Sequence, residues 1–85
     1  MKLGIIGSGM IVKDFLSFAH KLPEIKLEAI AARNIENLKE LQSKYNIKNI
    51  YTDIKLCLEN KEIDYRFEKY EDHLVFYMNL LQKPE

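Results

Sequence analysis

The sequence predicts an α/β fold, a three-layer sandwich in which a small parallel sheet with strand order 3-2-1-4 carries helices on both faces. Short and nearly continuous apolar runs alternate with longer amphipathic segments, which is the pattern of successive βα units. The first apolar run ends at a pair of glycines, and glycine allows the tight turn by which a strand enters a helix. Right-handed crossover connections wind such units into an open sheet.

The first βα unit covers residues 2–21. The apolar run over Lys2–Gly7 is typical of a strand that is covered on both faces. Residues 10–21 place their apolar side chains on one helical face, and Pro23 ends the helix. That face comprises Ile11, Phe15, Phe18, Ala19 and Leu22.

Two shorter units follow. Lys26–Ala32 predicts a second buried strand, and Asn34 is the expected cap of the next helix. The inward residues of that helix are expected to be Ile35, Leu38, Leu41 and Tyr45. Asn46–Tyr51 predicts a short third strand, after which Asp53 caps a brief helix that contains Leu56, Cys57 and Leu58.

The end of the chain differs in character. Glu62–Glu68 alternates strictly between apolar and charged residues, which indicates a fourth strand with one wet face. Seven of the eight residues 74–81 are apolar, and we interpret them as a helix without a polar side. Because so short a chain builds only a small core, we expect a homodimer held mainly by Leu74–Leu81. The edge of the fourth strand could add to it by pairing with a symmetry mate.

Composition excludes several classes of function. Thirteen Lys and Arg balance thirteen Asp and Glu, which argues against nucleic-acid and anionic-membrane partners. Hydrophobic residues make up 47% of the chain and there are only 3 Gly and 2 Pro, as in globular proteins. A single cysteine, no signal peptide and no long apolar run lead us to expect a cytoplasmic protein.

The chemically informative stretch is the glycine turn at residues 7–12. The first glycine permits the turn, the second lets a pyrophosphate approach the backbone, and the N–H groups at the helix N-terminus stabilise the anion. At the third fingerprint position Val12 replaces a small residue, which we expect to push the helix slightly off the strand and to weaken affinity. A turn that needs glycine only for its backbone angles is the alternative. The residues predicted to bind a dinucleotide here are Gly7, Ser8, Gly9, Met10 and Ile11.

From Lys2 to about Tyr65 the chain resembles the N-terminal dinucleotide domain of the Gfo/Idh/MocA oxidoreductases. The similarity runs through KLGIIGSGMIVKDFL and LEAIAARNIENLKELQSKYNIKNIYTDIKLCLENKEID. These segments carry the glycine turn, Ala-x-Arg at the end of the second strand, Tyr-x-Asp after the third and Glu-Ile-Asp before the fourth. The resemblance implies a Rossmann-like fold, a nicotinamide cofactor and, in complete members, hydride transfer on sugars, cyclitols or related hydroxyl substrates.

The end of the second strand bears on the choice of cofactor. An acidic residue usually accepts hydrogen bonds from the adenosine hydroxyls there, but this chain has Ala32, Arg33 and Asn34. Without the acid, Arg33 could pair with a 2′-phosphate, so the resemblance favours NADP over NAD. The alternatives for Arg33 are a solvated loop residue or stacking on adenine.

The resemblance stops after Asp64. Complete members continue with an apolar fourth strand, a Pro-Asn turn with a nearby His, and Glu-Lys-Pro with a catalytic lysine, none of which follows here. Residues 66–85 look more like the closing strand and helix of a full-length member. We therefore interpret residues 1–85 as one partial dinucleotide-binding domain joined by an internal deletion, although a frameshift or a truncation would look similar.

No catalytic or metal-binding residue is predicted. Lys83 precedes a proline at the chain end, but no strand comes before it to aim its side chain. No second His or Cys lies at metal-ligand spacing from His73, and His20 is expected to be a surface histidine. Cys57 lies between two leucines, as a core residue does.

The function predicted from these features is the NAD(P)-binding unit of a Gfo/Idh/MocA-like oxidoreductase that is not catalytic by itself. One alternative is a non-enzymatic oligomerising remnant that binds no nucleotide. Another is a subunit completed in trans by a separate substrate domain.

Overall fold

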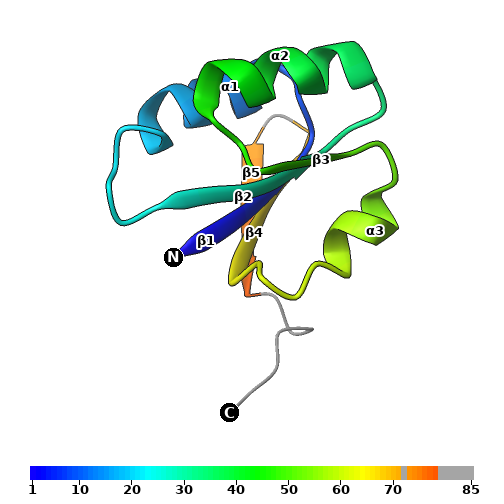
Figure 1. Ribbon diagram of the computed structural model, residues 1–85. Coiled ribbons are helices and arrows are strands. Elements are labelled where there is room, and N and C mark those ends of the chain that lie inside the picture. Colours follow the sequence, from blue (N-terminus) through cyan, green and yellow to red (C-terminus); the bar gives the residue numbers. More distant parts are fainter. Residues whose placement is uncertain (72, 79–85) are drawn as a thin grey trace.

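Five strands form one sheet in the order β3-β2-β1-β4-β5 (Figure 1). The computed structural model describes residues 1–71 and 73–78. The strands β1 to β4 run parallel to one another, and β5 runs antiparallel to β4. The elements are β1 (Lys2–Ile6), α1 (Met10–Ala19), β2 (Lys26–Ala31), α2 (Ile35–Tyr45), β3 (Asn49–Tyr51), α3 (Ile54–Leu58), β4 (Tyr65–Tyr70) and β5 (His73–Met78). The predicted α/β class is confirmed. The sheet is mixed rather than parallel as predicted, because β5 adds an antiparallel strand beyond the predicted 3-2-1-4 order.

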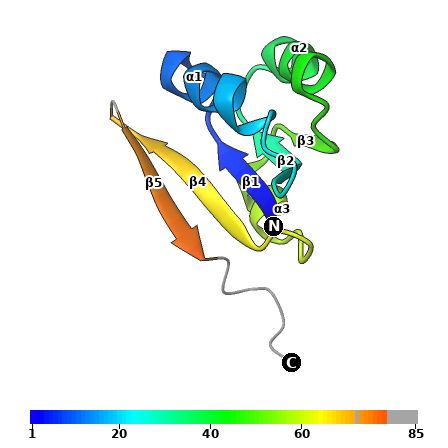
Figure 2. The ribbon, with the colours of Figure 1, turned by 90° about the vertical axis from the view of Figure 1, so that its left-hand side faces the viewer.

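Helices cover both faces of the sheet. Successive residues of β2 point to opposite faces, so that Ile30 joins the core under α1 and α2 while Ala29 and Ala31 pack with Cys57 of α3. Figure 2 shows α1 and α2 together on one side of the strands. The predicted three layers are therefore present.

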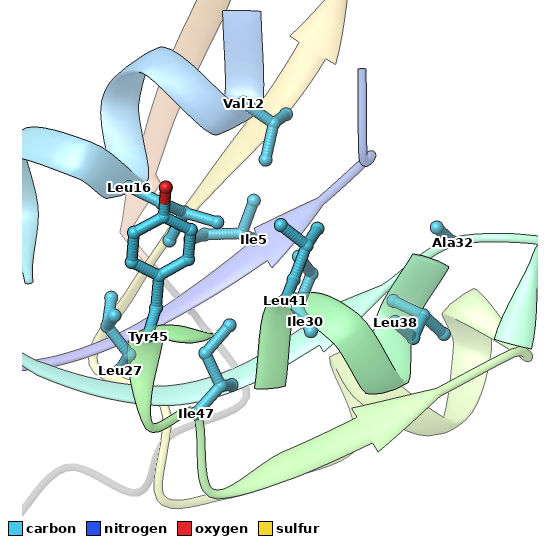
Figure 3. Packing of buried hydrophobic residues seen from close by; sticks show 10 residues of the cluster. All are labelled: Ile5, Val12, Leu16, Leu27, Ile30, Ala32, Leu38, Leu41, Tyr45 and Ile47. Atoms are coloured by element: carbon cyan, nitrogen blue, oxygen red, sulfur yellow. The ribbon is translucent and has the colours of Figure 1, made fainter. Parts of the chain in front are cut away.

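The larger core lies between the sheet and the helices α1 and α2 (Figure 3). Its side chains come from β1, β2 and both helices, together with the segment that leads into β3. The buried members are Ile5, Val12, Leu16, Leu27, Ile30, Ala32, Leu38, Leu41, Tyr45 and Ile47.

The inward face of α1 differs from the predicted one. The helix buries Val12, Leu16 and Ala19, whereas Phe18, expected inside, is 63% exposed. Phe15 lies at the border, where its ring contacts Phe67 edge-on at 4.5 Å between centroids. Two apolar stripes lie side by side on this helix, and only contacts with the sheet and α2 decide which one is buried.

Both predicted helix caps are confirmed. The Asn34 side-chain oxygen accepts hydrogen bonds from the backbone N–H groups of Glu36 and Asn37 at 2.9 and 3.1 Å. Asp53 accepts from the N–H of Lys55 at 3.0 Å. Along α2 the inward residues are as predicted, except that Ile35 in the first turn is 38% exposed.

The expected helix over Leu74–Leu81 is wrong for its described part, because residues 73–78 form the strand β5. Glu71 adopts a positive φ of 58° in the turn after β4, and the chain then pairs back along that strand. The centroid of the Phe76 ring lies 4.9 Å from the ring centroid of Tyr65 and 4.8 Å from that of Phe67. An unbroken apolar run suits a strand as well as a helix, and these cross-strand contacts select the strand. Residues 79–81 lie outside the described residues.

The fourth strand is an interior strand. The sequence predicts a free edge for this strand, but β4 pairs with β1 on one side and with β5 on the other. Among the described residues, the edges of the sheet are therefore the outer sides of β3 and β5. No helix within residues 1–71 and 73–78 is long and apolar enough to cross a membrane.

Candidate functional site

The glycine turn joins the carboxyl end of β1 to the N-terminus of α1. Gly7 has a φ of +126°, which side-chain-bearing residues rarely adopt, and its N–H donates to the carbonyl of Ala31 at 2.8 Å. Gly9 is the N-cap residue of α1 with ordinary extended angles, φ −79° and ψ −166°. No side chain in the described part of the protein caps this helix and its first turn holds no acidic residue, so its N–H groups and positive dipole end face the turn.

Val12 fits against the turn. It is fully buried in the larger core, and a Cβ placed on Gly7 would lie 3.4 Å from its Cγ2 atom, an ordinary contact. The helix therefore accommodates valine at the third fingerprint position by packing it inward. The expected weakening of cofactor affinity remains a prediction.

A hollow of about 410 Å³ opens beside the turn, at the carboxyl ends of the strands. It brings together the predicted residues Gly7, Ser8 and Arg33, although Arg33 is far from the turn in sequence. Its full lining is Ile6, Gly7, Ser8, Ala31, Ala32, Arg33, Asn34, Ile54 and Lys69. Two cations and no carboxylate are among these residues, so the hollow is suited to an anionic ligand.

The other three predicted site residues do not line the hollow. Gly9 lies in the turn itself, Met10 opens α1 with 74% of its surface exposed, and Ile11 packs against the larger core. Backbone groups at these positions are still at the helix N-terminus.

Lys69 is the site residue that sequence reasoning missed. It lies near the end of β4, one residue beyond the pair formed by Ile6 and Glu68, which places it beside Gly7. The available signal was the parallel pairing of the first and fourth strands, because carboxyl ends of parallel strands meet at one edge of the sheet.

The remaining reactive side chains lie away from the hollow. Burial raises the pKa of the Cys57 thiol to about 11, against a smaller lowering by Arg66, so the thiol is protonated near neutral pH. His20 is exposed, with its Nδ1 atom 2.8 Å from the Leu16 carbonyl oxygen. His73 is exposed on β5 beside Tyr70, and Lys83 lies outside the described residues. Among residues 1–71 and 73–78 no group of three His, Cys, Asp or Glu could hold a metal ion.

A larger hollow of about 640 Å³ lies elsewhere, at the amino-terminal ends of β1 and β2. Lys2, Lys26, Lys44 and Lys48 line it together with the buried carboxylate of Glu28. Lys2 is paired with Glu62 at 2.6 Å, and Glu28 lies 4.0 Å from Lys48. Ligands of open α/β sheets bind at the carboxyl ends of the strands, so the smaller hollow is the stronger candidate.

Comparisons with known proteins agree with this fold. Residues 1–67 match the model of an oxidoreductase family with an NAD-binding Rossmann fold. The uncharacterized oxidoreductase YgjR of Escherichia coli K12 is 23% identical over 64 residues, which cover 75% of this chain and 20% of that protein.

Solved structures share the fold. A probable dehydrogenase from Thermotoga maritima superimposes with a TM-score of 0.74 at 22% identity, covering 80% of this chain and 20% of that one. A scyllo-inositol dehydrogenase from Lactobacillus casei, solved with NAD(H) and scyllo-inositol, gives a TM-score of 0.75 at 21% identity and covers 82% and 21%. The chain spans about a fifth of the length of each of these relatives.

Proposed function

Because the chain belongs to the Gfo/Idh/MocA oxidoreductase family, in which an NAD-binding Rossmann fold covers residues 1–67 here, we propose that it binds a nicotinamide dinucleotide at its glycine turn. The observation that carries this proposal is the hollow beside Gly7. It combines the N-terminus of α1 with Arg33 and Lys69, and none of the described residues that line it is a carboxylate.

The residues present fit such a cofactor. The backbone at Gly7, Ser8 and Gly9 offers N–H groups to the pyrophosphate. Because the two glycines carry no Cβ, no side chain at these positions obstructs its approach to the backbone. Ala32 and Arg33 would lie beside the adenosine ribose at the end of β2. When bound, the nicotinamide ring accepts or donates a hydride, while the protein supplies binding and orientation.

Arg33 favours NADP over NAD. Ala32, buried in the core, carries no charge that would repel a 2′-phosphate, and Arg33 is exposed beside the hollow. The Asn34 side-chain oxygen already accepts hydrogen bonds from the first turn of α2. A charged phosphate partner for Arg33 is therefore the simplest specificity determinant on this part of the surface.

The chain is proposed to bind the cofactor without transferring a hydride by itself. Within the described residues, no histidine or carboxylate lines the hollow to move the proton of a substrate hydroxyl. Hydride transfer on sugars, cyclitols or related hydroxyl compounds is proposed for longer proteins that contain such a unit. A separate substrate domain added in trans would reveal itself as activity that appears only in the mixture.

Calorimetric titration with NADPH and NADH tests the proposal. The variant Gly9→Ala introduces a Cβ that meets no atom closer than the Lys69 Cε at 3.6 Å, so the fold tolerates it. The same Cβ obstructs the approach of a pyrophosphate, and we expect at least a tenfold loss of affinity. Ser43→Ala, at an exposed position on α2, is the control that should bind like the unmodified chain. No saturable binding by the unmodified, folded chain at millimolar NADPH would refute the proposal.

A second candidate function, self-association without nucleotide, is favoured by the outer edge of β5. Residues 74–78 carry no charge that would oppose pairing with another strand, and Phe76 and Met78 are 51% and 60% exposed. A two-fold axis would let β5 pair antiparallel with β5 of a second copy and cover both side chains. The oligomeric state in solution tests this candidate independently of cofactor binding.

A further inference from the structure

The Lys69 side chain lies along the glycine turn. A Cβ placed on Gly7 would be 3.0 Å from the Lys69 Cβ, and one placed on Gly9 would be 3.6 Å from its Cε. The aliphatic stem therefore follows the turn from its first glycine to its second. Lys69 is also one of the residues that line the hollow beside the turn.

Among the described residues, the Lys69 ammonium group has unused hydrogen-bonding capacity. Its Nζ donates to the backbone carbonyl of Glu71 at 2.8 Å, whereas an ammonium has three donors. The ion pairs found among the described residues join Lys2 to Glu62, Lys48 to Glu28 and Arg66 to Glu68. Glu68, the nearest carboxylate in sequence, is thus paired with Arg66 and does not neutralise Lys69.

This arrangement places like charges together. The N-terminus of α1 carries a partial positive charge, and Lys69 and Arg33 add two full charges around the same hollow. A cation at a helix N-terminus is unfavourable unless an anion lies between them. A diphosphate would meet both the N–H groups and the ammonium with charge-assisted hydrogen bonds.

We propose that Lys69 is a pyrophosphate-binding residue that closes over the glycine turn, exchanging its bond to the Glu71 carbonyl for one to a phosphate oxygen. The inference rests on the proposed dinucleotide function and adds a residue outside the 1–67 segment that matches the family. The hairpin of β4 and β5 would then serve the site directly, since Glu71 in its turn holds the ligand-free lysine.

The test compares Lys69→Met, which keeps the stem and removes the charge, with Lys69→Arg, which keeps the charge. Titrations use NADPH, NADH, ADP and adenosine, and circular dichroism checks the fold. We expect Lys69→Met to weaken NADPH, NADH and ADP about tenfold or more and to leave adenosine unchanged, because only the first three carry a diphosphate. The affinities of Lys69→Arg should remain within about threefold of those of the unmodified chain. Raising the salt concentration should weaken NADPH binding by the unmodified chain more than NADPH binding by Lys69→Met.

The outcomes separate the two proposals. If the unmodified chain binds NADPH and Lys69→Met binds it equally well, the role of Lys69 is refuted and the proposed function stands. If the chain binds ADP in a manner that depends on Lys69 but shows no preference for either dinucleotide over ADP, the lysine's role stands and the dinucleotide function fails. Binding of none of the diphosphates refutes both. Should Lys69→Met fail to fold, Lys69→Gln takes its place in the same comparison.

Discussion

Alanine at Gly7 is expected to destabilise the fold, whereas alanine at Gly9 is expected to leave it nearly unchanged. The two glycines are two residues apart in one turn, but their backbones differ. Gly7 has a φ of +126° and Gly9 has a φ of −79°. Only the first is a conformation that side-chain-bearing residues avoid.

The cost at Gly7 has two parts. Holding alanine in a sparsely populated backbone region costs of order 1–3 kcal/mol. The new Cβ would also lie 3.0 Å from the Lys69 Cβ, a backbone-anchored atom that cannot rotate away, and such overpacking costs a further ~1 kcal/mol or more. We therefore expect Gly7→Ala to lower the free energy of unfolding by roughly 2–4 kcal/mol in total.

At Gly9 the backbone is extended and the nearest atom to a new Cβ is 3.6 Å away. Loss of glycine from the N-cap position is expected to cost less than about 1 kcal/mol. Urea unfolding followed by circular dichroism measures the free energy of unfolding of both variants. In thermal unfolding, Gly7→Ala should lower the melting temperature by roughly 10–30 °C. Equal stability of the two variants, or a Gly7→Ala variant as stable as the unmodified chain, would refute this explanation of the turn.

Three further predictions concern the cofactor, the core and the sheet edge. Arg33→Ala should weaken NADPH by about 1.5–3 kcal/mol and leave NADH unchanged in calorimetry, whereas equal losses would indicate stacking on adenine. The fold raises the pKa of Cys57 from 9.0 to about 11, so its contribution to stability should be present below pH 9 and be lost as the pH rises to 11, and a flat profile in pH-dependent denaturation would contradict this. Phe76→Lys should yield monomers if β5 pairs with a second copy, and light scattering that finds a monomeric unmodified chain at tens of micromolar would exclude the dimer.

Much of the fold follows from local patterns in the sequence. The caps Asn34 and Asp53 bond to N–H groups two or three residues away, so their chemistry is complete within one turn of chain. The glycine turn is equally local, since the +126° angle of Gly7 restricts that position to glycine. These features also locate half of the candidate site, because the helix N-terminus that faces the pyrophosphate is part of the same turn.

Other features depend on contacts between segments far apart in the sequence. Packing against β1 and α2 determines which apolar stripe of α1 is buried. Phe18 is exposed, although its spacing along the helix is also compatible with a buried position. The composition of residues 73–78 is compatible with either a helix or a strand. Contacts of Phe76 with the aromatic rings of Tyr65 and Phe67 on β4 stabilise the strand.

The sequence by itself determined the order of the elements from β1 to β4, the caps of α2 and α3 and the glycine turn that marks the site, because each of these is fixed by interactions among neighbouring residues. Only the tertiary structure decided that Lys69 lies across that turn and that Arg33 shares its hollow. Both depend on the register between parallel strands whose residues are 26 to 62 positions apart. That register is set by the packing of the whole sheet, and no local pattern encodes it.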